Sequence, residues 1–178
     1  MKRKAEEYLA QFVYGAIDGT VTTFAVVAAA FGAGLSSTII IILGVANLVG
    51  DGFSMGASAY LSIKSERDLR RRAGAAEVME SPLADAFATF AAFVVVGFIP
   101  VLSYVADAVF VLHAPSDVLF IVSLSLTALA FISIGLLKAR VTKTSRLRAA
   151  SETFILGAIA ALLAYLFGDV LAALISKR

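Results

Sequence analysis

The stretch GVANLVGDGFSMGAS, residues 44–58, lies inside an apolar run from residue 38 to residue 62. That run is longer than the roughly 20 helical residues needed to cross the hydrocarbon core of a membrane, so it predicts a transmembrane helix. Asn47, Asp51 and Met55 interrupt it one helical turn apart. Polar residues inside a membrane span are costly and commonly functional, so this helix face is a candidate site.

The composition extends this interpretation to the whole chain. Of the 178 residues, 60% are hydrophobic, and the mean hydropathy is +0.93, which is too apolar for an ordinary soluble domain. The other apolar runs of spanning length are residues 10–33, 85–105, 118–137 and 151–175. None shows the alternation that is typical of a membrane β-barrel. We therefore expect an all-α integral membrane protein, a single domain of five transmembrane helices over residues 1–178, with a short connection at 63–84 and a kink at Pro100.

The basic residues predict how the chain is oriented in the membrane. All of the 15 lysines and arginines except Lys177 and Arg178 lie before the first span or in the second and fourth connections. The positive-inside rule then places the N-terminus in the cytoplasm and, after five spans, the C-terminus outside. Residues 70–72, three consecutive arginines, are expected to set this topology and to contact lipid headgroups. Basic residues spread over three juxtamembrane segments do not form a nucleic-acid-binding face.

Cysteine is absent, which excludes disulfides, thiolate metal sites and cysteine-based catalysis. No cofactor is expected. The N-terminal segment leads into the first span without an A-x-A-like cleavage site, so we expect this span to be retained. The expected location is an integral position in the cell membrane of a prokaryote or in a vacuolar-type membrane.

Two carboxylates lie well inside the predicted spans. Asp18 lies about eight residues into the first span, and Asp51 about eleven residues from the cytoplasmic end of the second, so at about 1.5 Å per residue both fall at a similar depth. A charged group in hydrocarbon costs roughly 2.5–3.5 kcal/mol on insertion scales, so it lines a cavity, pairs with another group or binds a cation. A structural pair that shares one proton is the alternative to a metal site.

Helical spacing adds further ligands to these carboxylates. One face of the second span carries Asn47, Asp51, Ser54, Met55 and Ser58, and Asp18 and Thr22 share a face of the first. Carboxylate and amide oxygens beside a thioether favour a soft first-row metal such as Fe²⁺ over Mg²⁺ or Ca²⁺. Small-residue faces at Gly15/Gly19 and Gly52/Gly56 allow close helix packing, and we expect a two-fold dimer to form through the helices that bear them.

At these residues the chain resembles the vacuolar iron transporter family. The resemblance is most specific in YGAIDGTVTTFAVVAA, residues 14–29, and GVANLVGDGFSMGASAYLSIKSE, residues 44–66. It implies a homodimer of five-helix subunits that moves Fe²⁺, and sometimes Mn²⁺, out of the cytoplasm in exchange for protons. It also implies that Asp18 and Met55 line the pathway near the dimer interface.

The chain departs from the family pattern in two places. Plant members have a glutamate at the position of Asn47, whereas here the carboxylate comes one turn later, at Asp51. They also have a long cytoplasmic metal-binding domain between the second and third helices, of which only Glu77, Met79 and Glu80 resemble the start. The chain is therefore expected to be a short form, with Glu77 and Glu80 as a weak accessory metal site or a solvated helix face.

Two other classes of function compete with transport. A membrane metal sensor or scaffold would need the same site without moving the ion, and it remains open at this point. An intramembrane aspartyl protease would also use two aspartates. However, Leu48 replaces the first glycine of the expected G-x-G-D pattern, and Ile17 stands where a tyrosine would precede the first aspartate.

Overall fold

The computed structural model describes residues 2–74 and 81–176 of the chain, with side chains from residue 8 onward. These residues form helices and no strand, in the order α1 (Lys2–Gly32), α2 (Ser37–Arg72), α3 (Pro82–Gly97), a 3-10 turn η1 (Ile99–Val101), α4 (Leu102–Phe110), α5 (Ser116–Thr142) and α6 (Arg146–Ile175). Five helical segments are long and apolar enough to cross a membrane, the third of them being the continuous unit Pro82–Phe110. The predicted all-α class and number of spans are confirmed.

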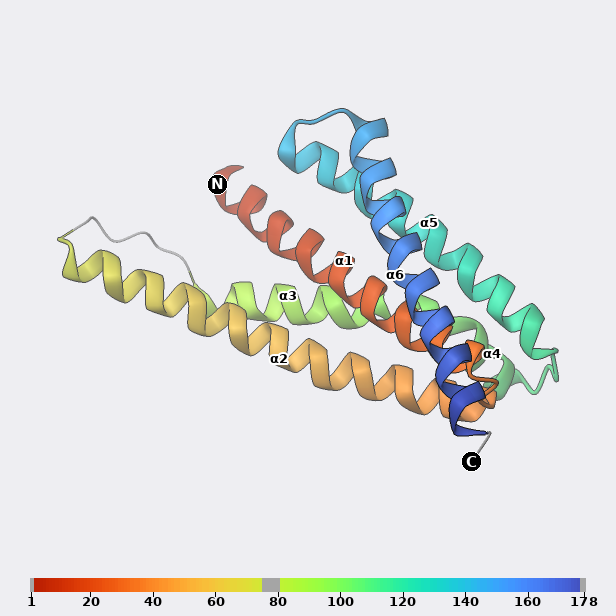
Figure 1. Cartoon of the computed structure of the whole chain (residues 1–178). Helices are drawn as coiled ribbons and strands as arrows, with labels where there is room; N and C mark the ends of the chain where they lie inside the picture. The colour runs from red at the N-terminus through yellow and green to blue at the C-terminus, as the bar shows by residue number, and fades with distance from the viewer. Residues whose placement is uncertain (1, 75–80, 177–178) are drawn as a thin grey trace.

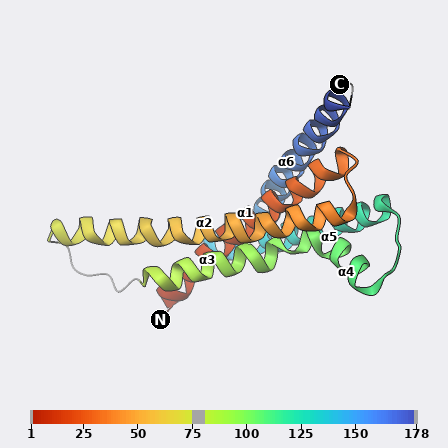
Figure 2. The same cartoon turned by 90° about the horizontal axis from the view of Figure 1, so that it is seen from below.

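Helix α1 lies at the centre of the bundle and packs against α2, α3, α5 and α6 (Figures 1 and 2). One apolar cluster holds Val13 and Ala16 of α1 against Ala92 and Ile134. A second surrounds Phe24 and Val27 near the other end of α1. Burial along most of the length of α1 therefore fixes this helix as the scaffold for the residues that it carries.

The third span is interrupted as expected at Pro100. Proline cannot donate a backbone hydrogen bond and restricts the residue before it, and here α3 ends at Gly97 before η1 and α4 complete the span. The Ser123 hydroxyl of α5 donates to the Pro100 carbonyl, and the Ser103 hydroxyl donates to the Leu119 carbonyl at 3.0 Å. These bonds tie the interrupted span to α5.

The small-residue faces pack inside one subunit. A Cβ atom on Gly15 or Gly19 would overlap the carbonyl oxygens of Thr89 or Phe93 in α3. Gly56 also faces α3, because a Cβ added there would lie 3.2 Å from the Ala86 oxygen. Helix α3 therefore occupies these glycine faces within the subunit. The expected dimer through the helices that carry them stays a prediction, and it would use other faces of these helices.

Helix α2 extends well beyond the rest of the bundle (Figures 1 and 2). Residues 63–72, expected to belong to the connection, continue the helix to Arg72. Glu66 and Arg70 form an exposed ion pair on this extension. The two chain ends lie at opposite ends of the molecule (Figure 1), as an odd number of spans requires.

Candidate functional site

Asn47 sets the position of α2 against α1. Its Nδ2 donates to the Thr23 hydroxyl at 3.1 Å and lies 3.4 Å from the Thr22 hydroxyl. Thr22 donates its own proton to the Asp18 backbone carbonyl at 2.9 Å. An amide inside a membrane span is thus hydrogen-bonded across the helix pair, and the pair is held in one register.

This register brings the two carboxylates together. Helices α1 and α2 run in opposite directions. The residue one turn before Thr22 on α1 therefore lies opposite the residue one turn after Asn47 on α2. Asp18 and Asp51 occupy those positions, and Asp51 is close enough to act on Asp18 electrostatically. Asp18 is half-buried, whereas Asp51 is exposed on the surface of the single subunit.

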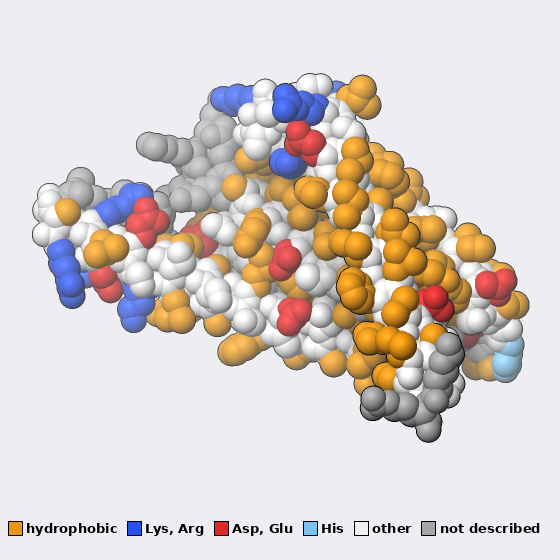
Figure 3. All heavy atoms as spheres, viewed as in Figure 1, with side chains coloured by type: hydrophobic (Ala, Val, Ile, Leu, Met, Phe, Trp, Pro, Cys, Tyr) orange, Lys and Arg blue, Asp and Glu red, His pale blue; other side chains and the backbone are white. Residues whose placement is uncertain are grey.

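The remaining residues of the α2 face continue from Asp51 toward the α2 C-terminus. Met55 follows one turn later and is half-buried, and Ser54 and Ser58 are exposed. Figure 3 shows acidic side chains on the middle of this surface, away from the basic ends of the molecule. The thioether and the two carboxylates therefore lie along one side of the α1–α2 pair.

The described residues of one subunit do not form a metal site of carboxylates and histidines by themselves. Within residues 8–74 and 81–176 no group of three or more His, Cys, Asp or Glu side chains is placed to hold a metal ion. The α1–α2 face offers two carboxylates, the side-chain oxygen of Asn47 and the sulfur of Met55. Such donors suit a divalent first-row cation, but a dehydrated ion needs more ligands than the two carboxylates supply.

The face that carries Asp51 is exposed on the single subunit. The residues that share this face and are exposed with it are small or polar: Gly50, Ser54 and Ser58. A carboxylate that faced hydrocarbon here would be strongly unfavourable, so it needs water, a cation or a protein partner beside it.

The expected accessory residues Glu77 and Glu80, with Met79, lie outside the described residues. Their assignment as metal ligands stays a prediction.

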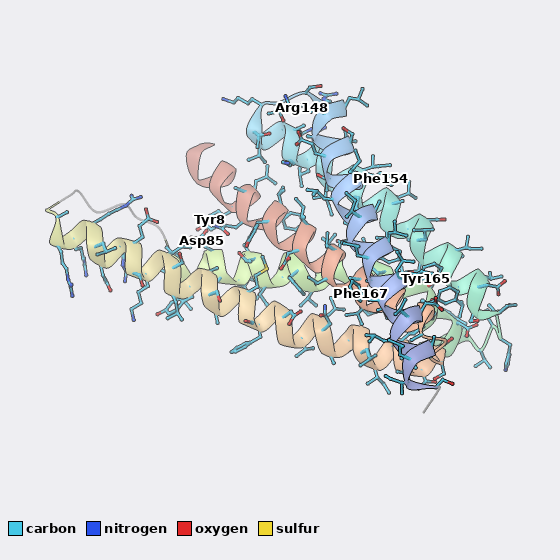
Figure 4. All side chains as sticks on the ribbon, viewed as in Figure 1. Tyr8, Asp85, Arg148, Phe154, Tyr165 and Phe167 are labelled. Carbon is cyan, nitrogen blue, oxygen red and sulfur yellow. The ribbon has the colours of Figure 1, made fainter. Side chains whose placement is uncertain are left out.

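Sequence reasoning missed two polar contacts of α1. Thr23 is fully buried and accepts the shorter Asn47 bond, although only Thr22 shares the Asp18 face by spacing. Asp85, at the start of α3 where α1 packs against it (Figure 4), is 3% exposed rather than hydrated. The neighbouring Thr89 hydroxyl lies 3.3 Å from Gln11 of α1 and 2.9 Å from the Asp85 carbonyl. The cluster of threonines in TVTTF was the sequence feature that could have indicated the contact between Thr23 and Asn47.

Comparison with known proteins shows similarity to one family over most of the chain. The family model described as the VIT family matches residues 9–80 and 70–169. A vacuolar iron transporter from Toxoplasma gondii is 41% identical over 64 residues, 36% of this chain and 21% of the relative. One from Plasmodium falciparum is 38% identical over 63 residues, 35% of this chain and 23% of the relative. The chain therefore aligns with less than a quarter of the length of these two relatives.

A third relative is similar over nearly the whole chain. Vacuolar iron transporter 1 from Arabidopsis thaliana is 28% identical in an alignment that covers 93% of this chain and 87% of the relative. The two parts of the family match meet at residues 70–80. That is the connection in which the sequence predicts a shortened cytoplasmic segment.

Proposed function

Because the chain belongs to the VIT family, we propose that it exports Fe²⁺ from the cytoplasm in exchange for protons, with Mn²⁺ or another divalent first-row metal as an alternative cargo. The observation that carries this proposal is the placement of Asp18 and Asp51 on facing turns of two membrane-spanning helices, next to the Asn47 side chain that bonds across the pair. The relatives' names supply iron as the cargo.

We propose that the ligands are Asp18, Asp51, Met55 and Asn47. The carboxylates supply negative charge, the Asn47 oxygen can turn to the ion while its nitrogen donates to Thr23, and the sulfur of Met55 favours a softer ion. A proton and a metal compete for the same carboxylate oxygens. Protonation on the far side of the membrane would release the metal, so an inward proton gradient drives metal outward.

A second copy of the chain is the proposed cover of the Asp51 face. A two-fold axis beside α1 and α2 would bring two Asp18–Asp51 pairs together, so that the dimer holds the ligands that one subunit lacks. This arrangement uses the face that the glycine contacts with α3 leave open.

Glu77 and Glu80 are proposed to raise the local concentration of cations at the cytoplasmic mouth of the pathway. The competing sensor or scaffold would bind metal without moving it. Proteolysis by the aspartates is not supported, because the relatives are named as transporters.

A flux assay in sealed vesicles tests the proposed function. Purified protein is reconstituted into vesicles that contain a metal-sensitive dye, and Fe²⁺, Mn²⁺, Co²⁺ and Zn²⁺ are added with and without a pH gradient. Metal movement that depends on the protein and speeds up with the opposing proton gradient supports exchange. Metal binding without flux would support the sensor.

Orientation is tested with single cysteines, since the native chain has none. A cysteine placed in the turn between α1 and α2, for example Leu35→Cys at an exposed position, should react with a membrane-impermeant maleimide from outside. A cysteine at Lys143, in the turn between α5 and α6, should react only after the membrane is opened. The reverse pattern would overturn the assigned topology.

Replacing Met55 by leucine should lower the transport of Fe²⁺ more than that of Mn²⁺. Leucine is close to methionine in volume but has no sulfur, so Fe²⁺ flux should fall several-fold while Mn²⁺ flux changes little. Initial rates for both metals in the same vesicle preparation measure this ratio. Equal losses for the two metals would mean that Met55 acts in packing.

A further inference from the structure

A small cavity with two arginines at its rim lies between α5 and α6. It has a volume of about 280 Å³ and is lined by Ser133, Leu136, Leu137 and Arg140 of α5 and by Arg146 of α6. The leucines form an apolar floor, and the arginines stand at the end where both helices leave the membrane. Figure 3 shows the basic side chains gathered there.

The charges around this cavity are not balanced within the subunit. Glu152 pairs with Lys138 at 3.4 Å and with Arg148, labelled in Figure 4, at 3.0 Å. Among the described side chains, Arg140 and Arg146 form no ion pair with a carboxylate. Helix α6 begins at Arg146 with no acidic residue in its first turn and no side-chain cap from Ser145. The exposed backbone N–H groups and the two guanidinium groups therefore favour an anion at this point.

A second, apolar groove continues from this cavity toward the middle of the membrane. It has a volume of about 430 Å³, shares Ser133 and Leu137 with the first cavity, and is lined by apolar residues of α1, α3, α4 and α5. Along α5 it extends from Leu137 to Leu126, which is about 16 Å at 1.5 Å per residue. That length is close to half of the roughly 30 Å hydrocarbon core, or one leaflet.

We propose that the cavity and groove together bind one anionic phospholipid of the leaflet on the basic side of the protein. Its phosphate lies between Arg140 and Arg146, and one acyl chain occupies the groove along α5. A free anion would not need the apolar groove. A lipid has both parts in the right order, with the charge at the membrane surface.

The proposal is tested by lipid binding to the purified full chain, independently of transport. Delipidated protein in detergent is titrated with phosphatidylglycerol or phosphatidylcholine, and bound lipid is counted by native mass spectrometry. The native chain should retain one phosphatidylglycerol per subunit in preference to phosphatidylcholine. The double variant Arg140→Gln/Arg146→Gln should bind phosphatidylglycerol about thirtyfold more weakly, because each basic residue near the surface contributes roughly 1 kcal/mol and about 1.4 kcal/mol corresponds to a factor of ten.

Lys143→Gln is the matched control, since it removes a positive charge from the same loop without changing the cavity. An equal loss in this control, or equal binding of the two lipids by the native chain, would overturn the proposal in favour of general charge attraction. Circular dichroism of each variant confirms that the helices remain.

A groove variant distinguishes a lipid from a free phosphate ion. Ser133→Phe places a ring where the cavity joins the groove, so it should weaken phosphatidylglycerol binding while both arginines remain. Excess inorganic phosphate should leave the bound lipid in place. Full displacement by inorganic phosphate, with no effect of Ser133→Phe, would mean that the cavity binds a free anion and not a lipid.

Discussion

Replacing Asp18 by asparagine should reduce metal–proton exchange to the level of protein-free vesicles. Asparagine has nearly the shape of aspartate, and the Thr22 hydroxyl bonds to the backbone carbonyl of residue 18, which the change retains. The variant should therefore fold. It loses the negative charge that holds a dehydrated dication and the group that carries the exchanged proton. Asp51→Asn leaves the half-buried Asp18 carboxylate in place, so it should impair exchange severely without abolishing it.

The measurement is the initial rate of Fe²⁺ uptake together with proton movement in the same vesicles. Asp169→Asn is a matched control, because Asp169 is also an aspartate of a spanning helix but lies exposed on α6, away from the α1–α2 face. It should transport at the parental rate. Parental exchange by Asp18→Asn vesicles would show that the proposed site is wrong and that the polar face serves packing.

Replacing Gly19 by alanine should destabilise the whole subunit. An added Cβ would overlap the Phe93 carbonyl oxygen and come within 2.9 Å of the Phe93 Cα. These are backbone atoms of α3, which cannot rotate away as a side chain can. Gly97 of α3 faces the same contact, since a Cβ added to it would lie 2.8 Å from the Gly19 oxygen. Overpacking a well-packed contact typically costs about 1–3 kcal/mol, and a backbone overlap should reach the upper end.

Gly50→Ala provides the control for Gly19→Ala. Gly50 also lies in a membrane-spanning helix, but nothing lies within 4 Å of its added Cβ. Alanine is the better helix former by about 1 kcal/mol, so this variant should be at least as stable as the native chain. Unfolding in sodium dodecyl sulfate, followed by circular dichroism, compares the two. Equal stabilities would mean that α1 and α3 do not pack this closely.

The sequence allowed the spans and the carboxylate pair to be predicted for different physical reasons. Each span is an apolar run long enough to cross the hydrocarbon core, so the hydrophobic composition of the sequence was sufficient to predict it. Asp18 and Asp51 lie at equal depth on helices joined by a tight turn at Gly34, where φ is +69°. Adjacent antiparallel helices then had to bring them near one another.

Other features depend on which helices pack together, and a sequence does not state this. The partner of Gly15 and Gly19 is α3, which follows much later in the chain. The role of Thr23 depends on the rotation of α2 that points Asn47 toward it. Hydropathy could not show that residues 63–72 are helical. The hydropathy index measures how well a segment fits in a membrane, and it does not measure whether the segment forms a helix.

The extension of α2 changes which charges its terminal arginines can interact with. Arg72 lies ten residues beyond residue 62, the expected end of the apolar run, which is about 15 Å along the helix axis. In physiological salt the Debye length is about 8 Å, so mobile ions weaken the attraction between these arginines and the charged bilayer surface. They instead lie in the last turn of α2, where they complement the partial negative charge of the helix C-terminus. The triple arginine therefore stabilises the end of the helix that carries it, and its contact with the headgroups stays a prediction.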